Sequence, residues 1–242
     1  SEMCIRDSAT TRTYYPLGLI HTIKQPLGQT STFEYDNYGN LSKRINAEGN
    51  VTEYTRDNAG NILEMKNAKG DITKYSYDEF NRLTSVTTPN GYITTYFYRA
   101  SGELSKILDP ESNETKFFYD TLGRLTTKVD PLNNTTSLFY DKNGNVEREI
   151  DPNGSTKNFE YDKLNQLKKK TLPDNLYEMV YDVRGNLKSI NDKNSNIDFE
   201  YTIVNGESVV NESLFNSNDI SYTLNYSYDA IGNRKSMASD YN

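Results

Sequence analysis

The chain has very few of the residues that build catalytic centres and metal sites. Its 242 residues include one histidine (His21), one cysteine (Cys4) and no tryptophan. A single histidine and a single cysteine supply neither a zinc ligand set nor a disulfide framework. A Cys-His or Ser-His-Asp triad would have no histidine to use other than His21. We therefore expect no enzymatic activity, no metal and no cofactor, and we interpret His21 as a surface residue.

Positive charge and long apolar runs are also scarce. Lys and Arg number 27 against 34 Asp and Glu, so the formal charge is -7. A duplex-binding protein needs the opposite balance, so no nucleic-acid partner is expected. No run approaches the roughly 18 apolar residues of a membrane span. The basic run LKKKTLP from Leu167 to Pro173 is interpreted as solvated lysines at an edge or outer face.

Aromatic residues are abundant despite this polar composition. The chain has 20 Tyr and 9 Phe, and only 34% of its residues are hydrophobic. A mean hydropathy of -0.83 would suit a disordered chain, but disordered segments generally lack so many rings. The rings must therefore pack in a folded structure. Residues 1–8 (SEMCIRDS) match nothing downstream and are interpreted as a non-native leader, which leaves 9–242 for the fold.

A heptapeptide that begins with Tyr-Asp recurs along the chain. It occurs as YDNYGNL at Tyr35, YDEFNRL at Tyr77, YDTLGRL at Tyr119, YDKNGNV at Tyr140, YDKLNQL at Tyr161, YDVRGNL at Tyr181 and YDAIGNR at Tyr228. The steps are 42, 42, 21, 21, 20 and 47 residues, and the degenerate copies RDNAGNI at Arg56 and YRASGEL at Tyr98 fill the gaps of 42. The period is therefore 21 residues, and about eleven copies cover the chain.

A second motif falls midway between these copies. It reads QPLG at Gln25, NAEG at Asn46, NAKG at Asn67, TPNG at Thr88 and DPNG at Asp151, while DPES, DPLN and LPDN place Ser112, Asn133 and Asn175 at the fourth position. We count the four turn positions from the Asp of the heptapeptide and from the first residue of the second motif. Both turns favour Asp or Asn at the first position and Gly or Asn at the fourth, which are the preferences of a type I turn. The fourth residue is expected to have a positive φ, which Gly and then Asn tolerate best. Each repeat is thus predicted to contain two turns that join two strands.

We name the turns that begin with Tyr-Asp the YD turns. Their predicted structural residues are Tyr35, Asp36, Gly39, Tyr77, Asp78, Tyr119, Asp120, Gly123, Tyr140, Asp141, Gly144, Tyr161, Asp162, Tyr181, Asp182, Gly185, Tyr228, Asp229 and Gly232. No catalytic, cofactor-binding or metal-binding residue is assigned.

The segments between turns are short and alternate as strands do. Aromatic residues lie two apart before each YD turn, as in Phe33 and Tyr35 or Tyr75 and Tyr77, and an aliphatic column that includes Leu41 follows it. The predicted fold is all-β: tandem β-hairpins of about 21 residues form a long, curved antiparallel sheet of about twenty strands with essentially no helix. The Tyr35-type and Leu41-type columns should share one closely packed face, and Thr, Lys, Glu and Ser should line a hydrated opposite face.

The repeated Tyr-Asp, followed after two residues by Gly, then Arg or Asn, then Leu, resembles the YD-repeat or Rhs family; YDTLGRL is nearly an ideal copy. The resemblance covers almost the whole chain. It implies a spiralling sheet that closes into a hollow shell, as in bacterial polymorphic toxins, toxin-complex subunits and the animal teneurins.

The resemblance further implies a secreted or cell-surface bacterial protein. Its partners would be the rest of the same polypeptide, namely the shell ends and an enclosed C-terminal toxin domain that lies outside this chain. Self-processing members carry a terminal R-x-x-Y-D-P-x-x-G-R-F motif with catalytic aspartates, and this motif does not occur before Asn242. We therefore do not transfer a protease role to Asp109, Asp130 or Asp151, which share one turn position.

Two other interpretations of the repeats start from the same residues. The row of YD aspartates could form a calcium ladder, but the nonapeptide period of a calcium β-roll is missing, so turn capping is favoured. The tyrosine rows could stack on carbohydrate in an extracellular adhesion module, which is the alternative function. A β-propeller enzyme with blades of two repeats is disfavoured, because odd and even copies look interchangeable.

The array is expected to be irregular at 202–227. Twenty-seven residues separate Tyr201 from Tyr228, and the stretch ESVVNESLFNSNDIS contains no YD turn. The extra residues are predicted to form a longer loop near Phe215 to Asp219.

Overall fold

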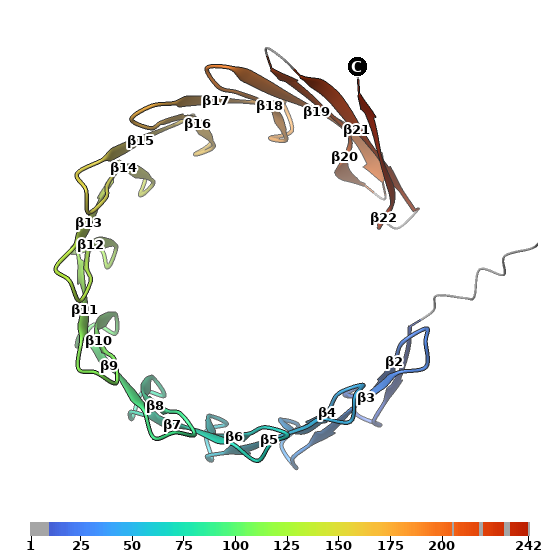
Figure 1. The fold of residues 1–242 in the computed structure, drawn as a ribbon, viewed down its shortest axis with the longest axis vertical. Coiled ribbons are helices and arrows are strands. Elements are labelled where there is room, and N and C mark those ends of the chain that lie inside the picture. Colours follow the sequence, from blue (N-terminus) through green and yellow to red (C-terminus); the bar gives the residue numbers. More distant parts are fainter. Residues whose placement is uncertain (1–9, 205, 218–219, 230–232, 242) are drawn as a thin grey trace, which may run out of the picture. The chain divides into compact units, whose positions relative to one another are not determined.

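The computed structural model describes residues 10–204, 206–217, 220–229 and 233–241, and the interpretation of 1–8 as a leader lies outside them. The described residues form 22 strands and no helix, so none of them lies in a helix that could cross a membrane. The chain divides into two compact units, Ser1–Phe117 and Phe118–Asn242, and the boundary falls within β11. Consecutive strands are joined as hairpins throughout each unit (Figure 1). The predicted all-β hairpin array is confirmed.

The first unit is an up-and-down meander in which each strand pairs antiparallel with the next. Its strands are β1 (Thr11–Tyr14), β2 (Ile20–Lys24), β3 (Thr30–Tyr35), β4 (Leu41–Ile45), β5 (Val51–Arg56), β6 (Ile62–Lys66), β7 (Ile72–Tyr77), β8 (Leu83–Thr87), β9 (Ile93–Tyr98), β10 (Leu104–Leu108) and β11 (Glu114–Tyr119).

The second unit continues the same alternation from β12 onward. Its strands are β12 (Leu125–Val129), β13 (Thr135–Tyr140), β14 (Val146–Ile150), β15 (Thr156–Tyr161), β16 (Leu167–Thr171), β17 (Leu176–Tyr181), β18 (Leu187–Asn191), β19 (Ser195–Val204), β20 (Glu207–Ser217), β21 (Ser221–Tyr228) and β22 (Arg234–Tyr241).

The β7–β8 hairpin shows the strand register within one repeat. Tyr75 lies opposite Val86, and Tyr77 lies opposite Leu83 after a bulge. Since directly opposed residues share a face, these aromatic and aliphatic side chains lie together on what we call the tyrosine face. Lys74 lies opposite Thr87 on the other face, the charged face.

The burial and polarity of the two sheet faces differ from the prediction. No hydrophobic side chain in the described part of the chain is fully buried, so the tyrosine face is only half-buried. The charged face carries cross-strand ion pairs, such as Lys43 with Glu34 at 3.3 Å. It also carries exposed rings, because Phe97 and Phe139 directly precede the tyrosines of β9 and β13. The tyrosine face is therefore less closely packed than expected, and the opposite face carries rings beside the expected Lys and Glu side chains.

The turns adopt the predicted geometry at most repeats. In the first YD turn, the Gly39 N–H donates to the Asp36 carbonyl at 3.0 Å and the Asp36 N–H donates to the Asn40 carbonyl at 2.8 Å. This is a type I turn followed by a residue in the left-handed region. Where glycine is missing, Asn81, Ser112, Asn133 and Asn165 have positive φ values of 59°, 68°, 63° and 59°.

Asn175 does not adopt this turn. The Leu172 N–H donates to the Asn175 carbonyl at 2.8 Å, and Asn175 is absent from the residues with positive φ. The turn is one residue shorter than its counterparts, which explains the repeat step of 20 residues between Tyr161 and Tyr181. The interpretation of LPDN as a further copy of the same turn was wrong.

The long loop predicted near Phe215 to Asp219 is also wrong for the described residues. Phe215, Asn216 and Ser217 belong to β20, where Phe215 lies opposite Ile197 of β19 and Tyr222 of β21. The extra residues lengthen β19 and β20 to 10 and 11 residues. In β19 the hydrophobic alternation of Ile197, Phe199, Tyr201 and Ile203 continues past the usual strand length. Residues 218 and 219 lie outside the described part of the chain.

Exchanging residues between two equivalent turns of the first unit should move stability in opposite directions. Ser112 has a left-handed backbone, so Ser112→Gly should stabilise the fold by about 0.5–1 kcal/mol. Gly91 has φ 83°, and a Cβ at this position would meet nothing within 4 Å, so Gly91→Ser should destabilise the fold by about 1 kcal/mol through the backbone alone. Urea unfolding monitored by circular dichroism measures both; shifts of the same sign would contradict the turn assignment.

Candidate functional site

The aspartate of each YD turn closes the turn through its side chain. In the turn at Asp36, Oδ1 accepts hydrogen bonds from the backbone N–H groups of Tyr38 and Asn40, both at 2.9 Å. The same pattern recurs at Asp57, Asp78, Asp120, Asp141, Asp162 and Asp182. At the opposite turns it recurs at Asp109, Asp130 and Asp151. These carboxylates therefore act as local acceptors for the turn backbone.

The hydrogen bonds stabilise the ionised carboxylates. The backbone N–H of Asn40 is the largest influence on the pKa of Asp36, and it holds that pKa below its usual value of 3.8. At Asp57 the largest influence is the side-chain amide of Asn61, which also lowers the carboxyl pKa. A charged acceptor forms stronger hydrogen bonds than a neutral one, so these turns are strongest when the aspartates are ionised.

The residue four positions after the aspartate links one turn to the next hairpin. Arg82 donates from Nε to Oδ2 of Asp78 at 2.7 Å, and its guanidinium carbon lies 4.7 Å from the ring centroid of Tyr98 in the following repeat. Arg124 repeats both contacts with Asp120 and Tyr140. Each arginine therefore combines an ion pair within its turn with a cation–π contact to the next repeat.

Asparagine at the same position makes the link by a different route. Asn61 donates to Oδ2 of Asp57 at 2.9 Å and to the side-chain oxygen of Asn81 in the next YD turn at 2.8 Å. Neighbouring turns are thus joined side by side at the edge of the sheet.

The tyrosine before the aspartate reaches across to the preceding hairpin, a contact we call the tyrosine clamp. Its hydroxyl donates to the backbone carbonyl of the aliphatic residue that starts the preceding departing strand. The pairs are Tyr77 to Ile62 (3.0 Å), Tyr98 to Leu83 (2.8 Å), Tyr140 to Leu125 (2.7 Å), Tyr161 to Val146 (3.0 Å), Tyr181 to Leu167 (2.9 Å) and Tyr201 to Leu187 (2.9 Å). Tyr228 makes an equivalent bond to Val210 at 2.6 Å.

The ladder between hairpins explains why this bond is needed. β8 pairs with β9 through only Ser85 with Thr95, Val86 with Thr94 and Thr87 with Ile93. The pairing between these two strands stops two residues short of Leu83. The hydroxyl of Tyr98 therefore supplies the bond between the hairpins at the ends of the strands next to the YD turns. A backbone carbonyl in a half-buried position needs such a donor.

The degenerate copy at Arg56 supports the same explanation. Arg56 occupies the tyrosine position, and its Nη2 donates to the carbonyl of Leu41 at 3.3 Å. The side chain differs, but the bond to the preceding departing strand is retained. Burial contributes most to a raised pKa of the clamp tyrosines Tyr77 and Tyr98, so the neutral hydroxyl donor is favoured.

The remaining sequence-predicted site residues are placed as follows. Gly39, Gly123, Gly144 and Gly185 have positive φ in their turns, whereas Gly232 lies outside the described residues. Tyr35 packs edge-on against Tyr15, whose hydroxyl donates to the Phe33 carbonyl at 3.3 Å.

The clamp was not foreseen from the sequence, although a signal for it exists. The position before the YD aspartate carries tyrosine at copy after copy and never phenylalanine. Two residues earlier, Phe33, Tyr75, Tyr96 and Phe117 interchange freely. The position before the aspartate keeps the tyrosine hydroxyl, whereas the position two residues earlier also accepts phenylalanine. This difference indicates that the hydroxyl at the position before the aspartate makes a hydrogen bond.

The calcium and carbohydrate interpretations gain no geometric support from the YD turns. The aspartate oxygens accept hydrogen bonds from their own turns, and the described residues contain no group of three His, Cys, Asp or Glu side chains that could hold a metal ion. The clamp tyrosines are half-buried, and their hydroxyls are engaged. His21 is also half-buried, with its ring centroid 4.6 Å from that of Tyr15.

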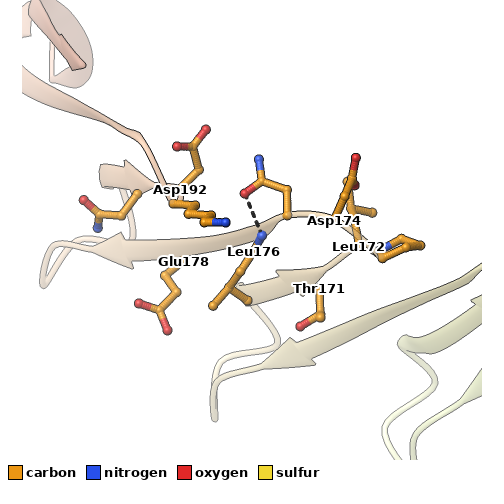
Figure 2. A pocket seen from close by; sticks show the side chains of 10 residues that line it. Thr171, Leu172, Asp174, Leu176, Glu178 and Asp192 are labelled. Atoms are coloured by element: carbon orange, nitrogen blue, oxygen red, sulfur yellow. Dashed lines mark hydrogen bonds between the residues drawn. The ribbon is translucent and has the colours of Figure 1, made fainter. Parts of the chain in front are cut away.

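The shortened turns of the second unit enclose a shallow groove of about 430 Å³. It is lined by residues that include Thr171, Leu176, Glu178 and Asp192. Figure 2 shows that the Glu178 and Asp192 side chains point to opposite sides of the sheet. Glu178 and Asp192 therefore do not converge, and the groove, which Asp174 also lines, contains no acidic group of three that could hold a metal ion among the described residues.

Removing one clamp hydroxyl should destabilise the fold measurably. Tyr98→Phe deletes the donor to the Leu83 carbonyl and should reduce the free energy of unfolding by about 1 kcal/mol. Tyr96→Phe is the matched control, because Tyr96 lies in the same strand and face and no hydrogen bond from its hydroxyl is found in the described structure. Equal losses in the two variants, measured by urea unfolding, would contradict the clamp.

Stability should fall at both ends of the pH range. The turn carboxyls of Asp36 and Asp57 have lowered pKa values when folded, so the unfolded chain binds more protons as acid is added, and stability is lost below about pH 5. The clamp tyrosines Tyr77 and Tyr98 have raised pKa values when folded, so these groups ionise first in the unfolded chain above about pH 10 and stability is lost again. Urea midpoints that are constant from about pH 3 to 11 would contradict both assignments.

Comparison with known proteins places this geometry in a family. The model of the Teneurin YD-shell family matches residues 31–240. No curated protein sequence matches the chain.

Solved structures share the fold at low sequence identity. The crystal structure of TcdB2-TccC3 without its hypervariable C-terminal region is 15% identical, has a TM-score of 0.63, and is matched over 96% of this chain but 16% of its own. The TcdB2-TccC3-TEV structure is 14% identical with a TM-score of 0.64, again over 96% and 16% of the two chains. A mutant Tc holotoxin pore of Photorhabdus luminescens is 16% identical with a TM-score of 0.51, over 96% and 17%.

This chain therefore spans about a sixth of the length of the structures that it resembles, and these matches establish the hairpin fold alone. The family model covers far more than half of the chain, and the repeated turns and clamps extend across the same residues. The chain belongs to the Teneurin YD-shell family.

Proposed function

We propose that this chain is a length of shell wall in a larger, secreted or surface-exposed bacterial protein, and that the wall encloses or displays a C-terminal toxin domain. The remainder of the same polypeptide would be its partner. The chain itself would catalyse no reaction.

The observation that carries the proposal is the absence of a core. No hydrophobic side chain among the described residues is fully buried, although the fold is regular across both units. An ordinary globular domain uses its chain length to bury apolar side chains against a second layer. Within each unit, the regular bonds between described residues run from hairpin to hairpin, as they would in the wall of a shell.

The faces of the sheet fit a wall in contact with other polypeptide. The tyrosine face is half-buried and rich in aromatic and aliphatic groups, whereas the charged face carries ion pairs such as Lys74 with Glu64 and Lys106 with Glu114. A surface that mixes apolar area with solvated charges can contact a partly folded chain without binding one sequence specifically.

Protease protection tests the proposal in the complete protein that contains this chain. The segment that follows the repeats should be cleaved at least about tenfold more slowly within the whole protein than when it is produced alone, because the wall excludes the protease. The isolated segment is the matched control. Equal cleavage rates would contradict enclosure, and specific binding of the repeat chain to an immobilised glycan would favour the adhesion alternative.

A further inference from the structure

A groove of about 550 Å³ lies between the turn at Tyr15 and the YD turn at Asp36, both in the first unit. The turn at Tyr15 makes the same backbone bonds as a YD turn. The Tyr15 N–H donates to the Leu19 carbonyl at 2.8 Å, and the Gly18 N–H donates to the Tyr15 carbonyl at 2.9 Å. Tyr15 therefore occupies the aspartate position of this turn, and Leu19 occupies the position four residues later. The residues that line the groove include Tyr15, Leu17, Leu19, Glu34, Tyr35 and Asp36.

An arginine occupies the corresponding place in a later repeat. A shift of 63 residues, which is three repeats, moves Leu19 onto Arg82. The guanidinium of Arg82 has four neighbours: Asp78 Oδ2 at 2.7 Å from Nε, the Arg99 carbonyl at 3.4 Å from Nη1, and the ring centroids of Tyr98 and Phe80 at 4.7 Å and 5.1 Å from its carbon.

The same shift of 63 residues relates these neighbours to the groove. Asp78, Phe80, Tyr98 and Arg99 correspond to Tyr15, Leu17, Tyr35 and Asp36, and all four of the latter line the groove. A second arginine, Arg124, makes the corresponding contacts with Asp120 and Tyr140. The groove of the first unit therefore lies where a guanidinium lies in these two repeats.

Leu19 leaves this place without a polar group. A leucine side chain is shorter than that of arginine and has no hydrogen-bond donor. It approaches the next turn instead, because a Cβ at Gly39 would lie 3.7 Å from Cδ1 of Leu19. The turns from Asp36 to Asp182 all carry a polar residue at the corresponding position, namely Asn40, Asn61, Arg82, Glu103, Arg124, Asn145, Gln166 and Asn186.

Tyr35 also differs from the clamp tyrosines. No hydrogen bond from its hydroxyl is found among the described residues, whereas the hydroxyl of Tyr98 donates to the Leu83 carbonyl at 2.8 Å. The Tyr35 ring is held by Tyr15, with the two ring centroids 6.0 Å apart and the planes at 89°. The groove thus contains a positioned ring that has lost both the cation and the clamp of its later counterparts.

The charges that line the groove are negative. Glu34 and Asp36 are its acidic residues, and no basic residue lines it. Oδ1 of Asp36 serves its own turn, whereas Oδ2 accepts from Nδ2 of Asn40 at 3.1 Å. Two basic groups are close to these acids. Lys43 pairs with Glu34 at 3.3 Å, and the charge of Arg56 adds to the larger effect of the Asn40 N–H in lowering the pKa of Asp36. Both are held outside the groove lining, so its own charge still favours a cation.

We propose that this groove binds an arginine side chain of another polypeptide segment, with the guanidinium over the Tyr35 ring and beside Glu34 and Asp36. Arginine fits better than lysine, because a guanidinium is planar, weakly hydrated and able to stack on a ring. Leu17, which is 88% exposed, supplies an apolar surface for the methylene groups of the arginine. This goes beyond the wall function, which does not depend on it.

Titration of the 242-residue chain with N-acetyl-arginine amide, followed by NMR of the backbone amides, tests the proposal. The amide signals of the turns at Tyr15 and Asp36 should shift with a dissociation constant of about 1–10 mM, as expected for one side chain in an open groove. The citrulline amide has nearly the same shape without the charge and should bind at least about fivefold more weakly. The lysine amide should bind at least about threefold more weakly. Equal binding of arginine and citrulline, or no saturable shift up to about 50 mM, would overturn the proposal.

Leu19→Arg fills the groove from within the chain. Arg82 and Arg124 show that such a turn accepts arginine, and the new guanidinium should weaken binding of the arginine amide at least about tenfold. Tyr35→Leu keeps an apolar side chain but removes the ring, and should weaken binding at least about threefold.

Leu27→Ser is the matched control, because it removes a side chain that is 86% exposed at another turn of the same unit. It should leave the affinity unchanged. Circular dichroism checks the fold of each variant, and Tyr35→Leu decides the question if Leu19→Arg does not fold. Unchanged affinity in the folded groove variants, or an equal loss in Leu27→Ser, would contradict binding at this groove.

Discussion

Within each unit, every described hairpin depends on its neighbours, because no hydrophobic side chain among the described residues is fully buried. The hydrophobic effect stabilises a fold in proportion to the apolar area removed from water, so half-buried side chains contribute only part of the stabilisation that full burial would give. Directional bonds between repeats therefore determine whether the array stays ordered. The tyrosine clamp is the most regular of these bonds, and from Tyr77 onward it joins most hairpins to the preceding one at the end where the backbone ladder is shortest.

One heptapeptide, YDEFNRL, contains the complete set of contacts. The tyrosine clamps the preceding hairpin, the aspartate closes the turn, the asparagine takes the left-handed position, the arginine bonds the aspartate and stacks on the next tyrosine, and the leucine carbonyl receives the next clamp. Each side chain thus acts either inside its own turn or on an adjacent repeat. Stability in such an array is the sum of local and nearest-neighbour contributions.

Local features could be predicted from the sequence because they depend on local chemistry. Turn residues and strict alternation indicated the hairpins, and the replacement of glycine by Asn81 or Asn165 followed from backbone sterics. The clamp joins residues 15 apart through a backbone carbonyl, which has no side-chain signature of its own. The strands around Phe215 were misjudged because a missing turn motif was interpreted as a loop, although the continued alternation of β19 was equally compatible with a longer strand pair.

Native-state hydrogen exchange tests the central claim that the clamp couples neighbouring hairpins. In the wild type, the amides of β7 to β10 should open together with similar free energies. In a variant with Phe at both Tyr77 and Tyr98, the amides of β8 and β9 that pair between hairpins should exchange at least about fivefold faster than those paired within hairpins. Uniform acceleration, or no acceleration at all, would contradict the claim that this hydroxyl bond joins the repeats.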